Sequence, residues 1–240
     1  MAPQVLFIYN EHLATEGLLG EAFTECGYDV TTFEVVPAER VHDPAGHVTF
    51  PDPADYDVVV PLGARWPVYD EALCDTWVGA EMQMLRDAAD AGVPTLGVCF
   101  GGQLLAQAFG GSVARSATPE IGWYDVTSDD ESLLPGGPWF QWHFDAFTLP
   151  PGATEIARTA NASQAFVLGR ALGLQFHPEL DRELLEGWLA DDPNGEVASV
   201  GLTHEQLRSA TREFENSAGR RIRGLVRGVL TRGASQPCPS

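Results

Sequence analysis

The chain has 240 residues, of which 44% are hydrophobic and 20% are charged, and this length and composition predict one globular domain with a single large core. Its 34 acidic and 14 basic residues give a formal net charge of -20, which disfavours nucleic acid and anionic membrane surfaces as partners because like charges repel. No apolar run approaches the roughly 20 residues of a membrane span, and the start of the chain lacks the features of a signal peptide. We therefore expect a cytoplasmic protein without a membrane anchor.

The first half of the chain alternates short apolar runs with helical patterns. Strands are predicted at residues 4–9, 29–35, 56–62 and 95–99. Helices are predicted at residues 13–27, 70–92 and 102–110. Regular alternation of strand and helix predicts an α/β fold whose sheet is mostly parallel, doubly wound and flanked by helices.

The second half is richer in strands. Short strand-like segments separated by turn residues occur at 111–117, 122–128, 153–160, 164–169 and 171–176, and they predict antiparallel hairpins added to the parallel sheet. A helix is predicted at 181–192 with Asp181 as its N-cap, and a longer one at 203–230 with a capping box of Thr203 and Gln206. We expect one domain over residues 1–232 and a flexible tail over 233–240.

Cys99 lies between glycines in the segment Gly97-Val98-Cys99-Phe100-Gly101, which has the pattern of a nucleophile elbow placed between a strand and a helix. Such an elbow holds the nucleophile in a strained conformation, so its close neighbours must be glycine. The start of the following helix favours the reactive thiolate, and the backbone N–H of Phe100 would point toward a developing oxyanion. The alternatives are a buried structural cysteine or a phosphate-binding turn, but no Lys-Ser/Thr pair follows the glycines.

A thiolate nucleophile needs a base, and His177 stands at the end of the strand-like run 171–176. Glu179 follows two residues later, where an extended chain would place it on the same side as His177. A carboxylate in that position can orient the imidazole and raise its basicity, so the three residues form a candidate Cys-His-Glu triad. Alone, the His-Pro-Glu segment would more often be a turn.

Together, the segment Gly-Val-Cys-Phe-Gly-Gly-Gln at 97–103 and the His-Pro-Glu at 177–179 resemble the class I glutamine amidotransferase family. The resemblance extends over most of the chain, through the blocks at 58–70, 120–123 and 141–147. It implies a single-domain, flavodoxin-like fold and hydrolysis of the glutamine side-chain amide through a γ-glutamyl thioester. It also implies that Cys99 is the nucleophile, His177 the general base and acid, and Glu179 the residue that orients His177.

The resemblance implies further site residues. The backbone N–H of Ala64 would complete the oxyanion hole with that of Phe100, and the substrate-binding residues would be Gln103, Gly63, His143 and Asp145. For His143 and Asp145 a hydrogen-bonded structural pair is an equal alternative. Two departures from the family pattern matter: Gly63-Ala64-Arg65 replaces Gly-Gly-Pro, which costs about 1 kcal/mol if Ala64 must adopt a positive φ, and Gly102 replaces a common histidine, which is expected to open space beside the thiol.

Members of this family normally pass ammonia to a synthetase. The roughly 60 residues after His177 leave no room for one, and no P-loop occurs, so the first hypothesis is a glutamine amidotransferase with a separate partner synthetase. The alternatives are a stand-alone hydrolase of γ-glutamyl amides or peptides and a non-catalytic regulatory module of the same fold. No cofactor or metal ion is expected, because the histidines lack metal-site spacing and the four cysteines show no pairing that suits zinc or a disulfide framework.

Overall fold

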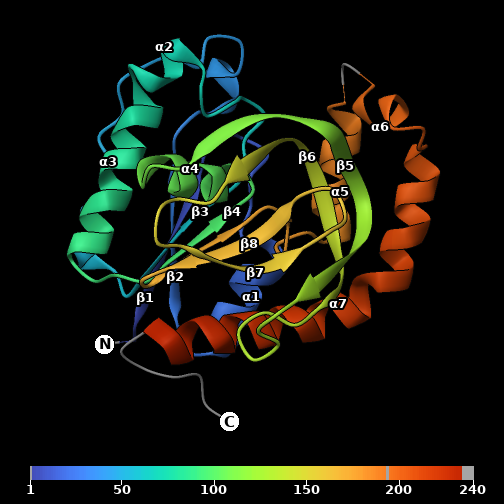
Figure 1. Cartoon of the computed structure of the whole chain (residues 1–240). Helices are drawn as coiled ribbons and strands as arrows, with labels where there is room; N and C mark the ends of the chain where they lie inside the picture. The colour runs from blue at the N-terminus through green and yellow to red at the C-terminus, as the bar shows by residue number, and fades with distance from the viewer. Residues whose placement is uncertain (1, 193–194, 234–240) are drawn as a thin grey trace.

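The computed structural model describes residues 2–192 and 195–233. A nine-stranded mixed sheet, in the order β2-β1-β3-β4-β9-β8-β7-β5-β6, forms its centre, with helices packed around it (Figure 1). The strands are β1 Gln4–Tyr9, β2 Asp29–Glu34, β3 Val58–Pro61, β4 Thr95–Val98, β5 Ser112–Ser128, β6 Gly137–Thr148, β7 Thr154–Arg158, β8 Ser163–Leu168 and β9 Ala171–Leu174. The α-helices are α1 Gly17–Glu25, α2 Glu71–Cys74, α3 Trp77–Asp90, α4 Phe100–Ala108, α5 Arg182–Ala190, α6 Glu196–Ser199 and α7 His204–Gly233, with short 3-10 turns at Ala38–Arg40 and Pro53–Asp55.

The parallel part of the sheet is formed by β2, β1, β3, β4 and β9. Every residue of β3, β4 and β9 is buried, which explains why these strands are continuous apolar runs: helices cover them on both faces. The carboxyl ends of β1, β3 and β4 lie at one edge of the sheet, where the crossover connections of such a fold leave a crevice.

The antiparallel part continues from β9 through β8 and β7 to β5 and β6. The sequence predicts two separate strands at 111–117 and 122–128, but the structure has the single long strand β5, with an irregularity between Arg115 and Glu120. It pairs along its length with β6, and the two form a curved arm that is prominent in Figure 1. The α/β architecture with added hairpins is confirmed, although parallel pairing is confined to β2, β1, β3, β4 and β9.

The helices differ from the prediction mainly at their ends. The predicted helix at 70–92 is divided into α2 and α3, and α1 begins at Gly17 instead of residue 13. The predicted N-cap is confirmed, since Asp181 accepts a hydrogen bond from the backbone of Leu184 at 2.7 Å. The capping box before α7 is also confirmed, with its two backbone N–H groups bonded at 2.8 and 3.2 Å.

Buried apolar side chains fill both faces of the sheet. One cluster packs beneath α1 and α7, a second packs beneath α2, α3 and α4, and a third joins β5 and β6 to α5 and the start of α7. Within residues 2–192 and 195–233, no helix combines the length and the apolar character that crossing a bilayer requires. Cys74 and Cys99 are free thiols. The predicted tail lies outside the described residues from position 234 onward.

Candidate active site

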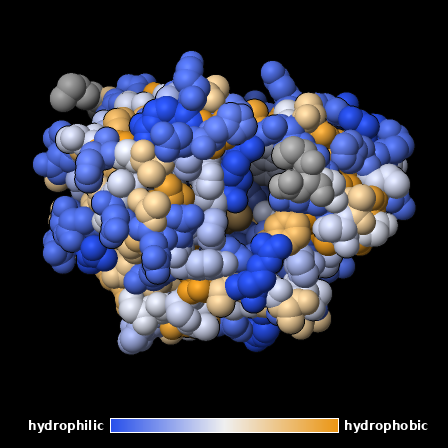
Figure 2. Space-filling model, turned by 90° about the horizontal axis from the view of Figure 1, so that it is seen from above, coloured by the Kyte–Doolittle hydropathy of each residue, from blue (hydrophilic) through white to orange (hydrophobic). Residues whose placement is uncertain are grey.

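A pocket of about 260 Å³ opens above the carboxyl ends of β1, β3 and β4, on the upper face of the molecule, which is hollowed near its centre (Figure 2). Eight of the nine residues predicted for the site line it, namely Gly63, Ala64, Cys99, Gln103, His143, Asp145, His177 and Glu179. The ninth is Phe100, whose side chain packs in the core. A core side chain is compatible with the role expected of Phe100, which uses its backbone N–H only.

Cys99 lines the pocket and has an unusual backbone conformation. It is the only non-glycine residue with a positive φ in the described ranges, with φ 51° and ψ -107°, a conformation that costs about 1–3 kcal/mol. It is also the N-cap residue of α4, so its thiol lies beside the free N–H groups of a helix start. The Sγ atom is 3.9 Å from the carbonyl oxygen of Trp142 and 4.0 Å from Nε2 of Gln175.

The glycines around Cys99 are required by close packing. A Cβ atom at Gly101 would lie 2.0 Å from the carbonyl oxygen of Pro61, and one at Gly97 would lie 2.5 Å from the carbonyl oxygen of Gly101. The expectation for Gly102 is wrong: a Cβ atom there would lie 2.1 Å from the carbonyl oxygen of Leu174. Gly102 therefore lets α4 approach β9 and opens no space beside the thiol.

His177 and Glu179 form a buried pair, with Nδ1 of His177 2.7 Å from Oε1 of Glu179. Both are fixed through their backbones: His177 N–H donates to the Phe140 carbonyl at 2.8 Å, and the Glu179 carbonyl accepts from Leu18 N–H at 3.0 Å. Gly17, at the start of α1, has φ +43°, and an added Cβ would lie 2.1 Å from that same Glu179 carbonyl. The first helix thus holds the acidic residue of the pair in place.

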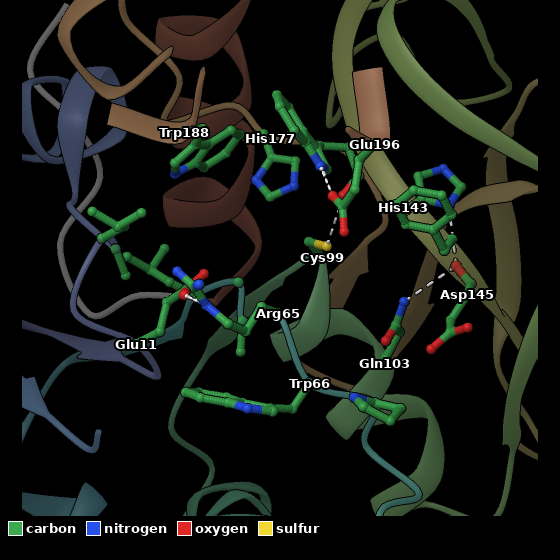
Figure 3. Close-up of a pocket in the computed structure, with 18 of the residues that line it drawn as sticks. Glu11, Arg65, Trp66, Cys99, Gln103, His143, Asp145, His177, Trp188 and Glu196 are labelled. Carbon is green, nitrogen blue, oxygen red and sulfur yellow. Dashed lines mark hydrogen bonds and ion pairs between the residues drawn. The ribbon is translucent and has the colours of Figure 1, made fainter. Parts of the chain in front are cut away.

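The electrostatics of His177 favour the charged imidazolium. Burial by itself would lower the pKa of His177, but the Glu179 carboxylate and the Cys99 thiol outweigh burial and raise that pKa well above its ordinary 6.5. The second ring nitrogen, Nε2, is buried without a hydrogen-bond partner among the described residues. Figure 3 shows Cys99 between His177 and Gln103, so Nε2 is available for proton exchange inside the pocket.

The loop after β3 brings the expected oxyanion donor to the same place. A Cβ atom at Gly63 would lie 3.2 Å from Cε1 of His177 and 3.8 Å from Cβ of Cys99, so the glycine is needed for close approach. Ala64 does not have a positive φ, and the strain considered for an alanine at this position does not arise.

The residues expected to bind substrate differ in how far their polar groups are already hydrogen-bonded to protein atoms. Nε2 of Gln103 is bonded to the backbone oxygen of Asp145 at 3.3 Å and to the side chain of Gln175 at 3.4 Å. Both ring nitrogens of His143 are engaged at 3.0 Å, one with Glu120 and the other with the backbone oxygen of Asp145. The Asp145 carboxylate is less constrained and lies at the pocket wall, 3.3 Å from the Tyr69 hydroxyl.

Several residues that line the pocket are not among the site residues expected from the sequence. Arg65 bridges Glu11 at 2.5 Å and Asp191 at 2.7 Å (Figure 3). Burial raises the pKa of Glu11 even though Arg65 acts in the opposite direction. Other lining residues of this kind are Trp66, Tyr69, Trp142, Trp188 and Glu196. Arg65 could have been suspected as a departure from the family pattern, but Trp188, Asp191 and Glu196 belong to segments without a motif.

Comparison with known proteins adds independent support for the fold. A glutamine amidotransferase from Thermotoga maritima matches with a TM-score of 0.82 and 26% identity, over 96% of this chain and 99% of that one. A glutamine amido transferase from Methylobacillus flagellatus matches with a TM-score of 0.81 over 100% of this chain and 98% of that one, and its 22% identity supports the fold alone.

Curated relatives match shorter stretches. A GMP synthase [glutamine-hydrolyzing] from Aeropyrum pernix is 40% identical over 113 residues, which is 41% of this chain and 22% of that enzyme. A corresponding enzyme from Thermus thermophilus is 42% identical over 146 residues, which is 54% of this chain and 28% of that enzyme. The chain therefore spans less than a third of the length of these relatives. The model of the glutamine amidotransferase class-I family matches residues 17–187, most of the chain, and with this match the chain belongs to that family.

Proposed function

We propose that this chain hydrolyses the side-chain amide of glutamine through a γ-glutamyl thioester on Cys99 and supplies the ammonia to a separate synthetase. The observation that carries the proposal is one pocket that holds a strained cysteine at a helix start and a His177–Glu179 pair joined at 2.7 Å. This arrangement provides a nucleophile, a base and a group that orients the base.

In the proposed reaction, Sγ of Cys99 attacks the amide carbon while its proton is held on Nε2 of His177 as the imidazolium, the form that the raised pKa of His177 favours. The backbone N–H groups of Phe100 and Ala64 donate to the oxyanion. His177 returns the proton to the departing amine as the carbon–nitrogen bond breaks, and Glu179 stabilises the imidazolium throughout. A water molecule deprotonated by His177 then attacks the thioester, which releases glutamate and restores the thiol.

Polar groups that line the pocket would hold the amino-acid end of the substrate. We assign this role to Gln103, Gly63 and the Asp145 carboxylate, which line the pocket. His143 would act by fixing the backbone of Asp145, because both of its ring nitrogens are already engaged by protein atoms. Delivery of ammonia to a synthetase is supported by the curated relatives, which are named as glutamine-hydrolysing GMP synthases and contain much more chain than this protein.

A second candidate is a stand-alone hydrolase of γ-glutamyl amides or peptides. The supporting observation is the extent of the pocket, which continues beyond the proposed triad to Arg65, Tyr69 and Trp188. A leaving amine larger than ammonia would need such space. The chemistry on Cys99 would be the same, and only the departing group would differ.

The test is an amine-release assay over glutamine and a panel of γ-glutamyl dipeptides, with wild type and Cys99→Ser. We expect glutamine turnover by the wild type and none by the variant, with unchanged circular dichroism. A marked preference for a dipeptide would favour the second candidate. Full activity of Cys99→Ser would refute the mechanism, and a wild type inactive on every substrate, with and without a candidate synthetase, would favour a non-catalytic module.

A further inference from the structure

A small polar cluster is buried in the core directly behind the pocket. It consists of Asn10 at the end of β1 and two residues one turn apart on α3, Trp77 and Glu81. All three are fully buried, and apolar side chains of the core beneath α2, α3 and α4 surround them. None of them lines the pocket, and none is used by the proposed reaction.

Asn10 connects this cluster to the loop that follows β3. Its Nδ2 donates to the carbonyl oxygen of Leu62 at 3.0 Å and to Oε1 of Glu81 at 3.2 Å. Leu62 immediately precedes Gly63 and Ala64, and its own N–H donates to the carbonyl of Ile8 at 3.0 Å. Both backbone groups of Leu62 are therefore engaged: its N–H by Ile8 of β1 and its carbonyl oxygen by the Asn10 side chain.

The same stretch of α3 also contacts the other expected oxyanion donor. The Trp77 ring packs against the Phe100 ring with centroids 5.6 Å apart, and against Trp66, on the loop after Leu62, at 6.1 Å. One face of one helix thus supports both backbone segments that would form the oxyanion hole. Packed side chains of this kind determine whether a donor is placed within the narrow geometry that catalysis needs.

Burial of this polar cluster lowers the stability of the fold. Oδ1 of Asn10, Nε1 of Trp77 and Oε2 of Glu81 have no hydrogen-bond partner within the described residues, and buried polar atoms without partners destabilise a fold. Apolar residues would fill the same space at lower cost. A costly polar group next to a catalytic loop suggests that it has a role other than stability.

We propose that Asn10 and Glu81 are positioning residues, which hold Leu62 so that the backbone N–H of Ala64 faces the oxyanion of the reaction. Glu81 orients the Asn10 amide, and Asn10 anchors the Leu62 carbonyl. This inference rests on the proposed function, because it assigns a purpose to the loop in that reaction.

Because Glu81 can ionise, the proposal predicts a specific dependence of kcat on pH. Burial raises the pKa of Glu81 to about 8, although the hydrogen bond from Asn10 acts to lower it. Asn10, which follows β1, is the side chain that acts on this pKa, and no charged group of the described elements contributes to its shift. Above pH 8 a negative charge would develop behind the loop and oppose the oxyanion.

The experiment compares Glu81→Gln, Asn10→Leu and a matched control, Thr211→Val. Thr211 is also buried and accepts a hydrogen bond from Trp123, and it lies on α7, away from the pocket. Glu81→Gln keeps an acceptor for Asn10 but cannot ionise. We expect it to retain kcat at pH 7 and to lose the decline in kcat that the wild type shows near pH 8.

For Asn10→Leu we expect kcat to fall by about 100-fold, with little change in KM, because an oxyanion donor acts mainly in the transition state. We also expect faster hydrogen exchange at the Gly63 and Ala64 amides, with both kcat and exchange unchanged in Thr211→Val. The proposal is overturned if Glu81→Gln has the wild-type pH profile, or if Asn10→Leu keeps both kcat and amide protection. Hydrogen exchange does not depend on turnover, so a wild type without activity would refute the proposed function while this readout still tests the anchoring of the loop.

Discussion

Replacing Glu81 by glutamine should make the protein more stable at neutral pH, by an amount that follows from the buried carboxyl. Burial raises the pKa of Glu81 from 4.5 to about 8, whereas the unfolded chain keeps the ordinary value. Between these two values the folded protein holds a proton that the unfolded chain has released, so stability falls as pH rises. At 1.36 kcal/mol per pKa unit, burial of Glu81 lowers the free energy of unfolding by about 3 kcal/mol at pH 7 and about 4 kcal/mol at pH 8, relative to a residue that does not ionise.

The measurement is the free energy of unfolding in urea at several pH values from 5 to 8, for wild type and Glu81→Gln. The stability difference between them should grow by about 3 kcal/mol over this range in favour of the variant. His177 titrates in both proteins, so its contribution cancels in the difference. A stability difference between wild type and Glu81→Gln that stays constant with pH would refute the reasoning.

Glu186→Gln is the matched control. Glu186 is exposed, and its hydrogen bond from Arg208 lowers its pKa, so it is mostly ionised in the folded and the unfolded state over this range. Its lowered pKa contributes stability that is present above the unfolded value and lost only as pH falls further. The stability difference between wild type and this variant should therefore not change between pH 5 and 8.

Three further outcomes follow from single contacts. Gly102→Ala should destabilise the protein by several kcal/mol because its Cβ would meet the backbone of β9 at 2.1 Å, whereas Gly187→Ala, with nothing within 4 Å, should not, and a comparison of Tm values checks this. Glu179→Gln should reduce kcat by at least about 100-fold while the protein stays folded, because an amide cannot stabilise the His177 imidazolium; wild-type kcat would contradict the triad. Asp181→Ala should lower stability by about 1 kcal/mol through loss of the α5 cap, and an unchanged urea midpoint would contradict that role.

The features that the sequence predicted well are local ones. The turn at Cys99 and the pair His177–Glu179 each lie within a few residues, so their glycine spacing and their i, i+2 geometry can be read from one short segment. The capping residues Asp181 and Thr203 were identified for the same reason. The strained φ of Cys99 is the structural counterpart of this pattern.

The features that sequence reasoning missed depend on contacts between distant segments. Glu81 lies in a helix whose periodicity reports only that one face is buried, and nothing in that pattern reveals that Asn10 is its partner. The expectation for Gly102 is wrong because a turn pattern does not tell which neighbour a glycine faces, here the backbone of Leu174. The sequence marks Arg65 only as a departure from the family pattern, since its two acidic partners are 54 and 126 positions away along the chain.

The contact between the start of α1 and the Glu179 carbonyl has a consequence for synthesis of the protein on the ribosome. Gly17 leaves the exit tunnel about 160 residues before Glu179, so this contact can form only after the whole intervening segment has also left the tunnel. Until then, His177 would lack a fixed Glu179 carboxylate and could not act as the oriented base that we propose for Cys99. In nascent chains Cys99 would therefore be unreactive toward substrate, and it would become reactive only when the start of α1 packs against Glu179.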